Sequence, residues 1–202
     1  MYARKQMSKE ELDSLLEHRQ RNSLPWHYPP RYDRGARHYM ITAACYRHSP
    51  VIAAKPTRLL DCARSLAEVV AAGTDNSLRA WVVLPNHYHV LVFSPDILAL
   101  LAQLGKMHGR LSRLWNLEDC AAGRKVWHGA VETGIKSDRH HHAVVNYIHH
   151  NPLKHGYVSR WQDWPASSAG DYLEAVGLDE ATRRWKEYPI EDFGTGWDDP
   201  DF

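Results

Sequence analysis

The chain has 202 residues, of which 44% are hydrophobic and 24% charged, enough for one well-buried core and too few for two full-sized domains. No apolar run approaches the roughly 18 residues that a membrane span requires, and the charged N-terminal segment is unlike a secretion signal. We therefore expect a cytoplasmic protein without a membrane contact. The three cysteines, Cys45, Cys62 and Cys120, are odd in number and widely spaced, which argues against a disulfide framework and a cysteine zinc site.

The charge of the chain is unevenly distributed. The formal net charge is +1, but residues 191–202 contain five acidic residues and no Lys or Arg. The preceding part therefore carries 25 Lys and Arg against 19 Asp and Glu. This modest basic excess is compatible with a phosphate-binding surface, and by itself it selects no function.

The first 36 residues indicate a short helix and a connector. Ser8 and Glu11 have the spacing of a capping box, and leucines follow at helical intervals. Residues 24–34 contain three prolines, which indicates extended chain leading into the main domain.

The main domain is expected to begin with a strand over residues 38–46 and a helix over residues 57–72, whose apolar residues recur on one side. Residues 78–84 and 87–93 are two β-rich runs separated only by a Pro-Asn pair. Such a short separation predicts a hairpin or near-hairpin.

The longest predicted helix follows the second of these runs. Ser94 supplies an N-cap and Pro95 a first-turn proline. One apolar stripe then runs along the helix, made of Ile97, Leu100, Leu101, Leu104, Met107, Leu111 and Leu114. A strand over residues 126–135 and a helix over residues 138–150, ended by Pro152, complete the pattern.

These elements follow one another in the order β-α-β-β-α-β, with one more helix at the end. The order matches the split βαβ, ferredoxin-like arrangement, an α+β fold whose sheet carries its helices on one face. The additional C-terminal helix contains Tyr147.

Two histidines in the second strand of the hairpin are candidates for a metal site. His87 and His89 are two residues apart, so their side chains project from the same face of a strand and can share one ion. The alternative is a pair of half-buried histidines with no ligand. Oxygen donors together with imidazole suit Mg²⁺ or Mn²⁺, and Zn²⁺ is a further option.

Two polar residues of the last helix are candidates for the rest of the site. Tyr147 and Asn151 are four residues apart and therefore share one helix face. Asn151 can offer a carbonyl oxygen to a metal, although asparagine before proline is also a common helix stop signal. Tyr147 can be a nucleophile or an ordinary core residue; its phenol, with a usual pKa near 10, attacks well only beside a group that polarises its target.

Two longer motifs around these residues resemble one protein family. Residues 80–91 read AWVVLPNHYHVL, and residues 147–156 read YIHHNPLKHG. Together they resemble the paired signatures of the REP-associated tyrosine transposases, single-tyrosine HUH transposases related to the IS200-like group. The resemblance extends over roughly residues 37–170.

This resemblance implies roles for the candidate residues. His87 and His89 match the His-hydrophobic-His motif, Asn151 the third metal ligand, and Tyr147 the nucleophile. The divalent metal, Mg²⁺ or Mn²⁺, holds the scissile phosphate of single-stranded DNA while Tyr147 attacks, giving a 5′-phosphotyrosine and a free 3′-hydroxyl. Many relatives outside the REP-associated branch have Gln in place of Asn151.

The resemblance also implies partners and a domain organisation. The expected target is hairpin DNA of repetitive palindromic elements, bound by a monomer, with a tyrosine-exchanging dimer as the alternative. A nucleoid-associated location in the cytoplasm follows. The expected division is an N-terminal helix and connector (1–36), a catalytic domain (37–170) and a C-terminal extension with an acidic tail (171–202), which could occupy the DNA groove as a mimic.

Several basic residues are candidates for phosphate contacts, although charged helix faces are more often simply solvated. They are Arg34, Arg37, Lys106, Arg110, Arg113, Lys136, Arg139 and Lys154. His150 and Glu132 are fallback metal ligands. Trp127, Trp161 and Trp164 could stack on unpaired bases, with core packing as the default.

Two other functions compete with the transposase. A domesticated nucleic-acid-binding protein would keep the fold and perform no chemistry, and a metallohydrolase would use Tyr147 only to orient water. The joint presence of two histidines, a tyrosine and a polar ligand favours the enzyme, because a pure binding module has no chemical need for that set.

Overall fold

The computed structural model describes residues 37–190. The helix expected after Ser8, the connector with Arg34 and the acidic tail all lie outside this range. The described strands and α-helices are β1 (His38–Ala44), α2 (Arg58–Ala71), β2 (Ser77–Val83), β3 (His87–Phe93), α3 (Ile97–Glu118), β4 (Val131–Gly134), α4 (Asp138–Lys154), α5 (Ala169–Val176) and α6 (Leu178–Glu187). Three short 3₁₀ turns, η2 (Tyr46–His48), η3 (Ile52–Ala54) and η4 (Trp161–Asp163), lie between them.

The strands form one antiparallel sheet in the order β2-β3-β1-β4. The central strand β3 pairs with β1 on one side, where His89 faces Thr42, and with β2 on the other, where His89 faces Val82. The expected mixture of helices with a four-stranded sheet is therefore confirmed. Because both flanks of β3 are hydrogen-bonded, its side chains are held in fixed directions.

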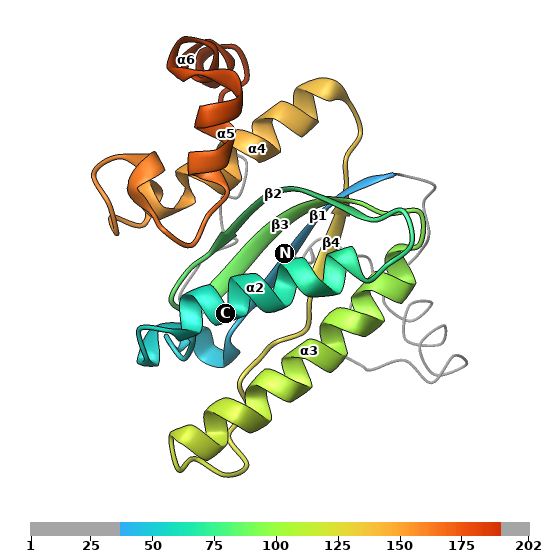
Figure 1. Cartoon of the computed structure of the whole chain (residues 1–202), viewed down its shortest axis with the longest axis vertical. Coiled ribbons are helices and arrows are strands. Elements are labelled where there is room, and N and C mark those ends of the chain that lie inside the picture. Colours follow the sequence, from blue (N-terminus) through green and yellow to red (C-terminus); the bar gives the residue numbers. More distant parts are fainter. Residues whose placement is uncertain (1–36, 191–202) are drawn as a thin grey trace, which may run out of the picture.

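Helices cover both faces of this sheet (Figure 1). On one face, Tyr88 and Val90 belong to a core that includes Leu66 of α2 and Leu104 of α3. On the other face, Leu91 belongs to a second core formed with α4. The expectation of helices on one face thus applies to α2 and α3, and the additional helix α4 closes the opposite face.

The second core is smaller and fixes the position of α4. It joins Met40 and Val82 of the sheet to Val144 and Ile148 of the helix, all of them buried. These two helical residues are four apart and therefore lie on one face of α4. After η4, α5 and α6 continue the chain beside α4 (Figure 1). Helix α6 packs against α4 and α5, and Tyr172 of α5 packs against the second core.

Helix α3 begins two residues later than expected. Its N-cap is Asp96, whose carboxylate accepts a hydrogen bond from the backbone N–H of Ala99 at 2.9 Å, so Ser94 is not the cap. The apolar stripe also shifts at its end. Leu114 is 47% exposed whereas Trp115 is 1% exposed, because a larger aromatic side chain reaches the core from the neighbouring position.

The last strand and the last helix of the predicted pattern differ in length from the expectation. Strand β4 covers only residues 131–134, and Trp127 forms just an isolated bridge with Cys45. Helix α4 continues through Pro152 to Lys154. Proline cannot donate to the carbonyl of Ile148, but the loss of this one hydrogen bond weakens the last turn without ending the helix at the proline.

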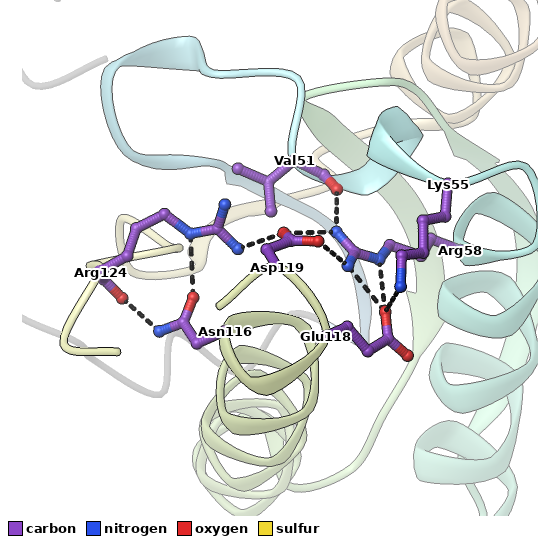
Figure 2. A network of polar contacts seen from close by, with 7 residues as sticks. All are labelled: Val51, Lys55, Arg58, Asn116, Glu118, Asp119 and Arg124. Carbon is purple, nitrogen blue, oxygen red and sulfur yellow. Dashed lines mark hydrogen bonds and ion pairs between the residues drawn. The ribbon is translucent and has the colours of Figure 1, made fainter. Parts of the chain in front are cut away.

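A buried arginine ties the start of α2 to the end of α3 (Figure 2). Arg58 is 2% exposed and its guanidinium donates to Glu118 at 2.7 Å and to Asp119 at 2.5 Å. Hydrogen bonds from Arg58 and then from Arg124 hold the pKa of the Asp119 carboxyl well below its usual range. A further bond from Arg58 to the carbonyl of Val51 closes this end of the molecule.

None of the helices between residues 37 and 190 combines the length and the apolar character that crossing a membrane would require.

Candidate active site

His87 and His89 lie side by side on the sheet face that α4 covers. Their side chains are 4% and 0% exposed, and their ring centroids are 4.9 Å apart in an edge contact. Tyr88 between them points into the opposite core, as the alternation of a strand requires. The predicted common face of the two imidazoles is therefore observed.

Helix α4 places Tyr147 and Asn151 against these two rings. The side-chain oxygen of Asn151 is 3.2 Å from Nε2 of His87, and the hydroxyl of Tyr147 is 3.5 Å from Nε2 of His89. Both helical residues are buried, with exposed fractions of 1% for Asn151 and 0% for Tyr147. The structure thus brings all four candidate residues together. Tyr147 and Asn151, one turn apart on α4, lie opposite His89 and His87, two residues apart on β3.

The turn residue Asn86 fixes the orientation of the His87 ring. The Asn86 amide nitrogen donates to the carbonyl of His48 at 3.1 Å, which leaves its oxygen facing Nδ1 of His87 at 2.7 Å. An amide oxygen only accepts, so Nδ1 of His87 carries the proton. In the neutral ring Nε2 is then unprotonated and directs its lone pair towards Asn151.

A second polar residue supports His89 in a similar way. The hydroxyl of Thr42 on β1 lies 2.8 Å from Nδ1 of His89. Since Thr42 faces His89 directly across the β1–β3 pair, the sheet register itself sets this contact. Partners of this kind on the far ring nitrogen orient metal-binding histidines and raise their basicity.

The donor set fits a divalent cation. Two ligands in neighbouring octahedral positions, each about 2.1 Å from the ion, lie roughly 3 Å apart, close to the 3.2 Å between His87 and Asn151. The lone pair of His87 and the oxygen of Asn151 repel without a cation or proton between them. The amide nitrogen of Asn151 is also buried without a hydrogen-bond partner in the described structure. Such a buried, unsatisfied polar group is uncommon and is consistent with a further group binding at this point.

The third donor of this candidate metal site, beside His87 and His89, is the side-chain amide of Asn151. Within residues 37–190, no three His, Cys, Asp or Glu side chains come together as a metal-binding group. Two imidazoles and one amide oxygen therefore leave several positions of a hard ion open for phosphate oxygens or water.

Lys154 is the predicted basic residue that reaches the site. Its ammonium group lies 5.3 Å from the centroid of the Tyr147 ring. This is a cation–π contact, which places one positive charge beside the face of the Tyr147 ring.

The basic residues of α3 lie away from the four residues of the candidate site, and their contact with phosphates stays a prediction. Lys106 and Arg110 line a groove between α2 and α3 that also includes Glu68. Arg113 follows on the same helix, which packs against the Tyr88 face and not the face of the two histidines. The periodicity of α3 placed these cations beside its apolar stripe but could not tell which face of the sheet would receive the stripe.

The remaining described candidates lie towards the other end of α4. Lys136 and Arg139 flank the start of that helix, and Arg139 precedes Tyr147 by eight residues, about 12 Å along a helix. Arg37 enters β1 and donates to the carbonyl of Pro95 at 3.5 Å.

Both fallback ligands point away from the site. The His150 ring stacks on Trp185 with centroids 3.5 Å apart, and burial lowers its pKa to about 4. Glu132 is paired with Ile41 across the sheet and shares its face, which is the α2 and α3 side.

The three tryptophans considered for base stacking have partners within the protein. Trp127 stacks on His108 with centroids 4.4 Å apart, and Trp161 stacks on His150. The indole N–H of Trp164 donates to the carbonyl of Val83 at 2.8 Å. Core packing is therefore the better description of all three.

Asn86 and Thr42 were not among the candidates from the sequence. In the sequence, Asn86 indicates only a turn and Thr42 only one position of a strand. The available signal for Asn86 was its position directly before the first histidine, and the contact of Thr42 depends on strand pairing, which the sequence does not display.

Comparisons with known proteins agree with the motifs. The chain is 34% identical over 95 residues to the REP-associated tyrosine transposase of Escherichia coli K12, a match over 45% of this chain and 53% of that protein. It is 31% identical over 100 residues to a putative REP-associated tyrosine transposase of Haemophilus influenzae, covering 43% of this chain and 54% of that protein. The chain thus spans about half the length of the curated relatives it matches. No protein-family model matches it.

A solved structure shares the fold. It is described as a REP-associated tyrosine transposase bound to a REP hairpin, and the match covers 76% of this chain and 89% of that chain. The TM-score is 0.55 at 22% sequence identity, which supports a common fold. Together with the curated relatives, it confirms the resemblance to REP-associated tyrosine transposases that the two motifs indicated.

Proposed function

We propose that the chain is a metal-dependent transposase of the HUH single-tyrosine type, which cleaves and rejoins single-stranded DNA at hairpins of repetitive palindromic elements. The observation that carries this proposal is the convergence of His87, His89, Tyr147 and Asn151 at one point between β3 and α4. The relatives named above support the substrate class. The strand order β2-β3-β1-β4 supports a ferredoxin-like assignment of the sheet, with α4 as the added tyrosine helix.

His87, His89 and Asn151 would hold Mg²⁺ or Mn²⁺, with Asn86 and Thr42 keeping the two rings in place. The ion, when bound, supplies Lewis-acid polarisation of the scissile phosphate. The protein residues do the rest of the positioning: β3 fixes the imidazoles, and α4 places the Tyr147 oxygen beside them.

The covalent step follows from this arrangement. The Tyr147 oxygen attacks phosphorus, its proton passes to solvent, and the bond from phosphorus to the 3′-oxygen breaks. The 3′-oxygen of the upstream fragment leaves with a proton as a free hydroxyl, and the downstream fragment stays on Tyr147 through its 5′-phosphate as a phosphodiester. Attack by a 3′-hydroxyl reverses the step and joins the strands with no external energy source. Lys154 favours the attacking phenolate through its charge.

The full burial of Tyr147 favours one alternative, a nucleic-acid-binding protein that performs no chemistry. In the enzyme, DNA binding must open the path to the tyrosine oxygen. We further propose that the chain acts as a monomer and is associated with the nucleoid in the cytoplasm. The alternative is a dimer whose subunits exchange their tyrosine helices.

Trapping of the covalent complex tests the proposal. A labelled hairpin with single-stranded flanks, incubated with the protein and Mn²⁺, should give a denaturant-resistant adduct that Tyr147→Phe and His87→Ala abolish. Tyr157→Phe is the matched control, because this exposed tyrosine follows the same helix. Cleavage that persists in Tyr147→Phe would support a hydrolase, and binding without cleavage under every metal would support the non-catalytic protein.

A further inference from the structure

The ring of Tyr46, in the turn η2 that follows β1, contacts two exposed cations, Arg47 of the same turn and Lys125 of the segment between α3 and β4. The guanidinium of Arg47 lies 5.5 Å from the centroid of the Tyr46 ring, and the ammonium of Lys125 lies 4.5 Å from it. The His128 ring contacts the same tyrosine with a centroid distance of 5.0 Å. Two like charges on one ring repel each other, so the arrangement gains most when an anion binds beside them.

Neither cation is neutralised by a carboxylate within residues 37–190. In the part of the chain that the structure describes, no carboxylate forms an ion pair with Arg47 or Lys125. The neighbouring Arg124 differs, because it donates to Asp119 and Asn116 and is committed to the network at the end of α3 (Figure 2). The segment before Lys125 is thereby anchored while Lys125 itself stays available.

The backbone fixes the positions of these side chains relative to one another. The N–H of Tyr46 donates to the carbonyl of Val126 at 2.7 Å, and the N–H of Arg47 donates to Nε2 of His128 at 3.3 Å. Arg47 and His48 have φ angles of 55° and 50°, a left-handed conformation that is uncommon for residues other than glycine. Strained backbone of this kind is often retained where a side chain must point in one direction for function.

The turn is also joined directly to the candidate active site. The carbonyl of His48 accepts the hydrogen bond from Asn86, whose oxygen holds His87. One side chain therefore connects the cationic turn with the first metal-binding candidate. An anionic strand that lies across Arg47 and Lys125 would lead towards His87.

We propose that Tyr46, Arg47, Lys125 and His128 form a surface that binds the phosphates of the single-stranded DNA flanking the scissile phosphate. The proposal rests on the proposed function for the identity of the strand. The paired cations supply phosphate contacts, and the tyrosine and histidine rings keep the cations in place and offer a π-face at the edge of the surface.

Binding without catalysis tests this surface. The probe is a fluorescein-labelled single-stranded oligonucleotide, titrated in EDTA at several salt concentrations with Tyr147→Phe as the background, so no cleavage interferes. The test variant combines Arg47→Asn, which tolerates the left-handed backbone, with Lys125→Gln. The control combines Arg64→Gln with Lys186→Gln, which removes the same charge from two exposed positions on α2 and α6 that are not among the candidate phosphate contacts.

Loss of two phosphate contacts should reduce the magnitude of the negative slope of log K against log salt by about 1.4 and weaken binding roughly tenfold at 0.1 M salt. The control should leave both quantities nearly unchanged. Equal effects of both pairs, or no effect of the Arg47 and Lys125 pair, would overturn the proposal. If the wild-type protein forms the tyrosine adduct while the Arg47 and Lys125 changes have no effect on binding, only the proposed surface is refuted. If no adduct forms while these changes reduce the magnitude of the salt slope, only the enzymatic function is refuted.

Discussion

Replacing Asn86 with alanine tests how the site holds its first histidine. The Asn86 oxygen is 2.7 Å from Nδ1 of His87, and the opposite end of the amide is fixed by the carbonyl of His48. Without this acceptor the ring can rotate or carry its proton on Nε2, the atom that faces Asn151. Loss of such an orienting partner typically weakens metal binding by about 10-fold to 100-fold.

The assay is titration with Mn²⁺ followed by electron paramagnetic resonance of the free ion. Asn86→Ala should raise the dissociation constant by that factor, whereas Asn86→Asp should retain most of the affinity because a carboxylate still accepts from Nδ1. Nitrogen-15 NMR of the histidine side chains adds a direct check, since His87 should carry its proton on Nδ1 in the wild-type protein and lose this preference in Asn86→Ala. An unchanged manganese affinity in Asn86→Ala would refute the reasoning, whatever happened to activity.

Three further changes report on the scaffold around the site. Arg58→Ala leaves the carboxylates at the end of α3 without their buried partner and should lower the free energy of unfolding by about 3 kcal/mol, measured by urea denaturation. Burial lowers the pKa of His108 to about 4. Because this folded-state pKa lies below the unfolded value of 6.5, the contribution of neutral His108 to stability is present above pH 6.5 and is lost as the pH falls towards 4. The free energy of unfolding should therefore fall by about 2 kcal/mol less between pH 7 and pH 5 in His108→Gln than in the wild-type protein. Asn146→Ala removes hydrogen bonds to the carbonyls of Arg184 and Tyr188 and should increase hydrogen exchange in α6 well before the sheet exchanges. If α6 stays as protected as in the wild-type protein, those bonds do not hold it.

The parts of the fold that depend on local pattern were predictable. The alternation of β3 placed His87 and His89 on one face, and the four-residue spacing in α4 placed Tyr147 with Asn151. The helix stripe from Ile97 to Leu111 is buried as expected. Each of these inferences needs only the period of one element, which the sequence displays directly.

The parts that depend on pairing between distant segments were not predictable. The contact of Thr42 with His89 requires the β1–β3 register, and the separation of Lys106 from the site requires knowing which sheet face α3 covers. Asn86 is a further case, because its role depends on the carbonyl of His48, which lies far from it in the sequence and comes close only in the folded chain. A sequence pattern gives the direction of a side chain within its element, but only packing decides what that side chain meets.

The two halves of the candidate site are therefore held by different forces. The histidines depend on backbone hydrogen bonds of β3, which is paired along both edges and cannot move alone. Tyr147 and Asn151 depend on side-chain packing of α4 in the smaller of the two cores. Packing contacts of a helix can be exchanged at lower cost than a strand can be removed from a sheet, because no backbone hydrogen bonds are broken. If Tyr147 must become accessible for DNA to reach it, the movement is expected in α4 and its C-terminal helices, while the histidines stay in place.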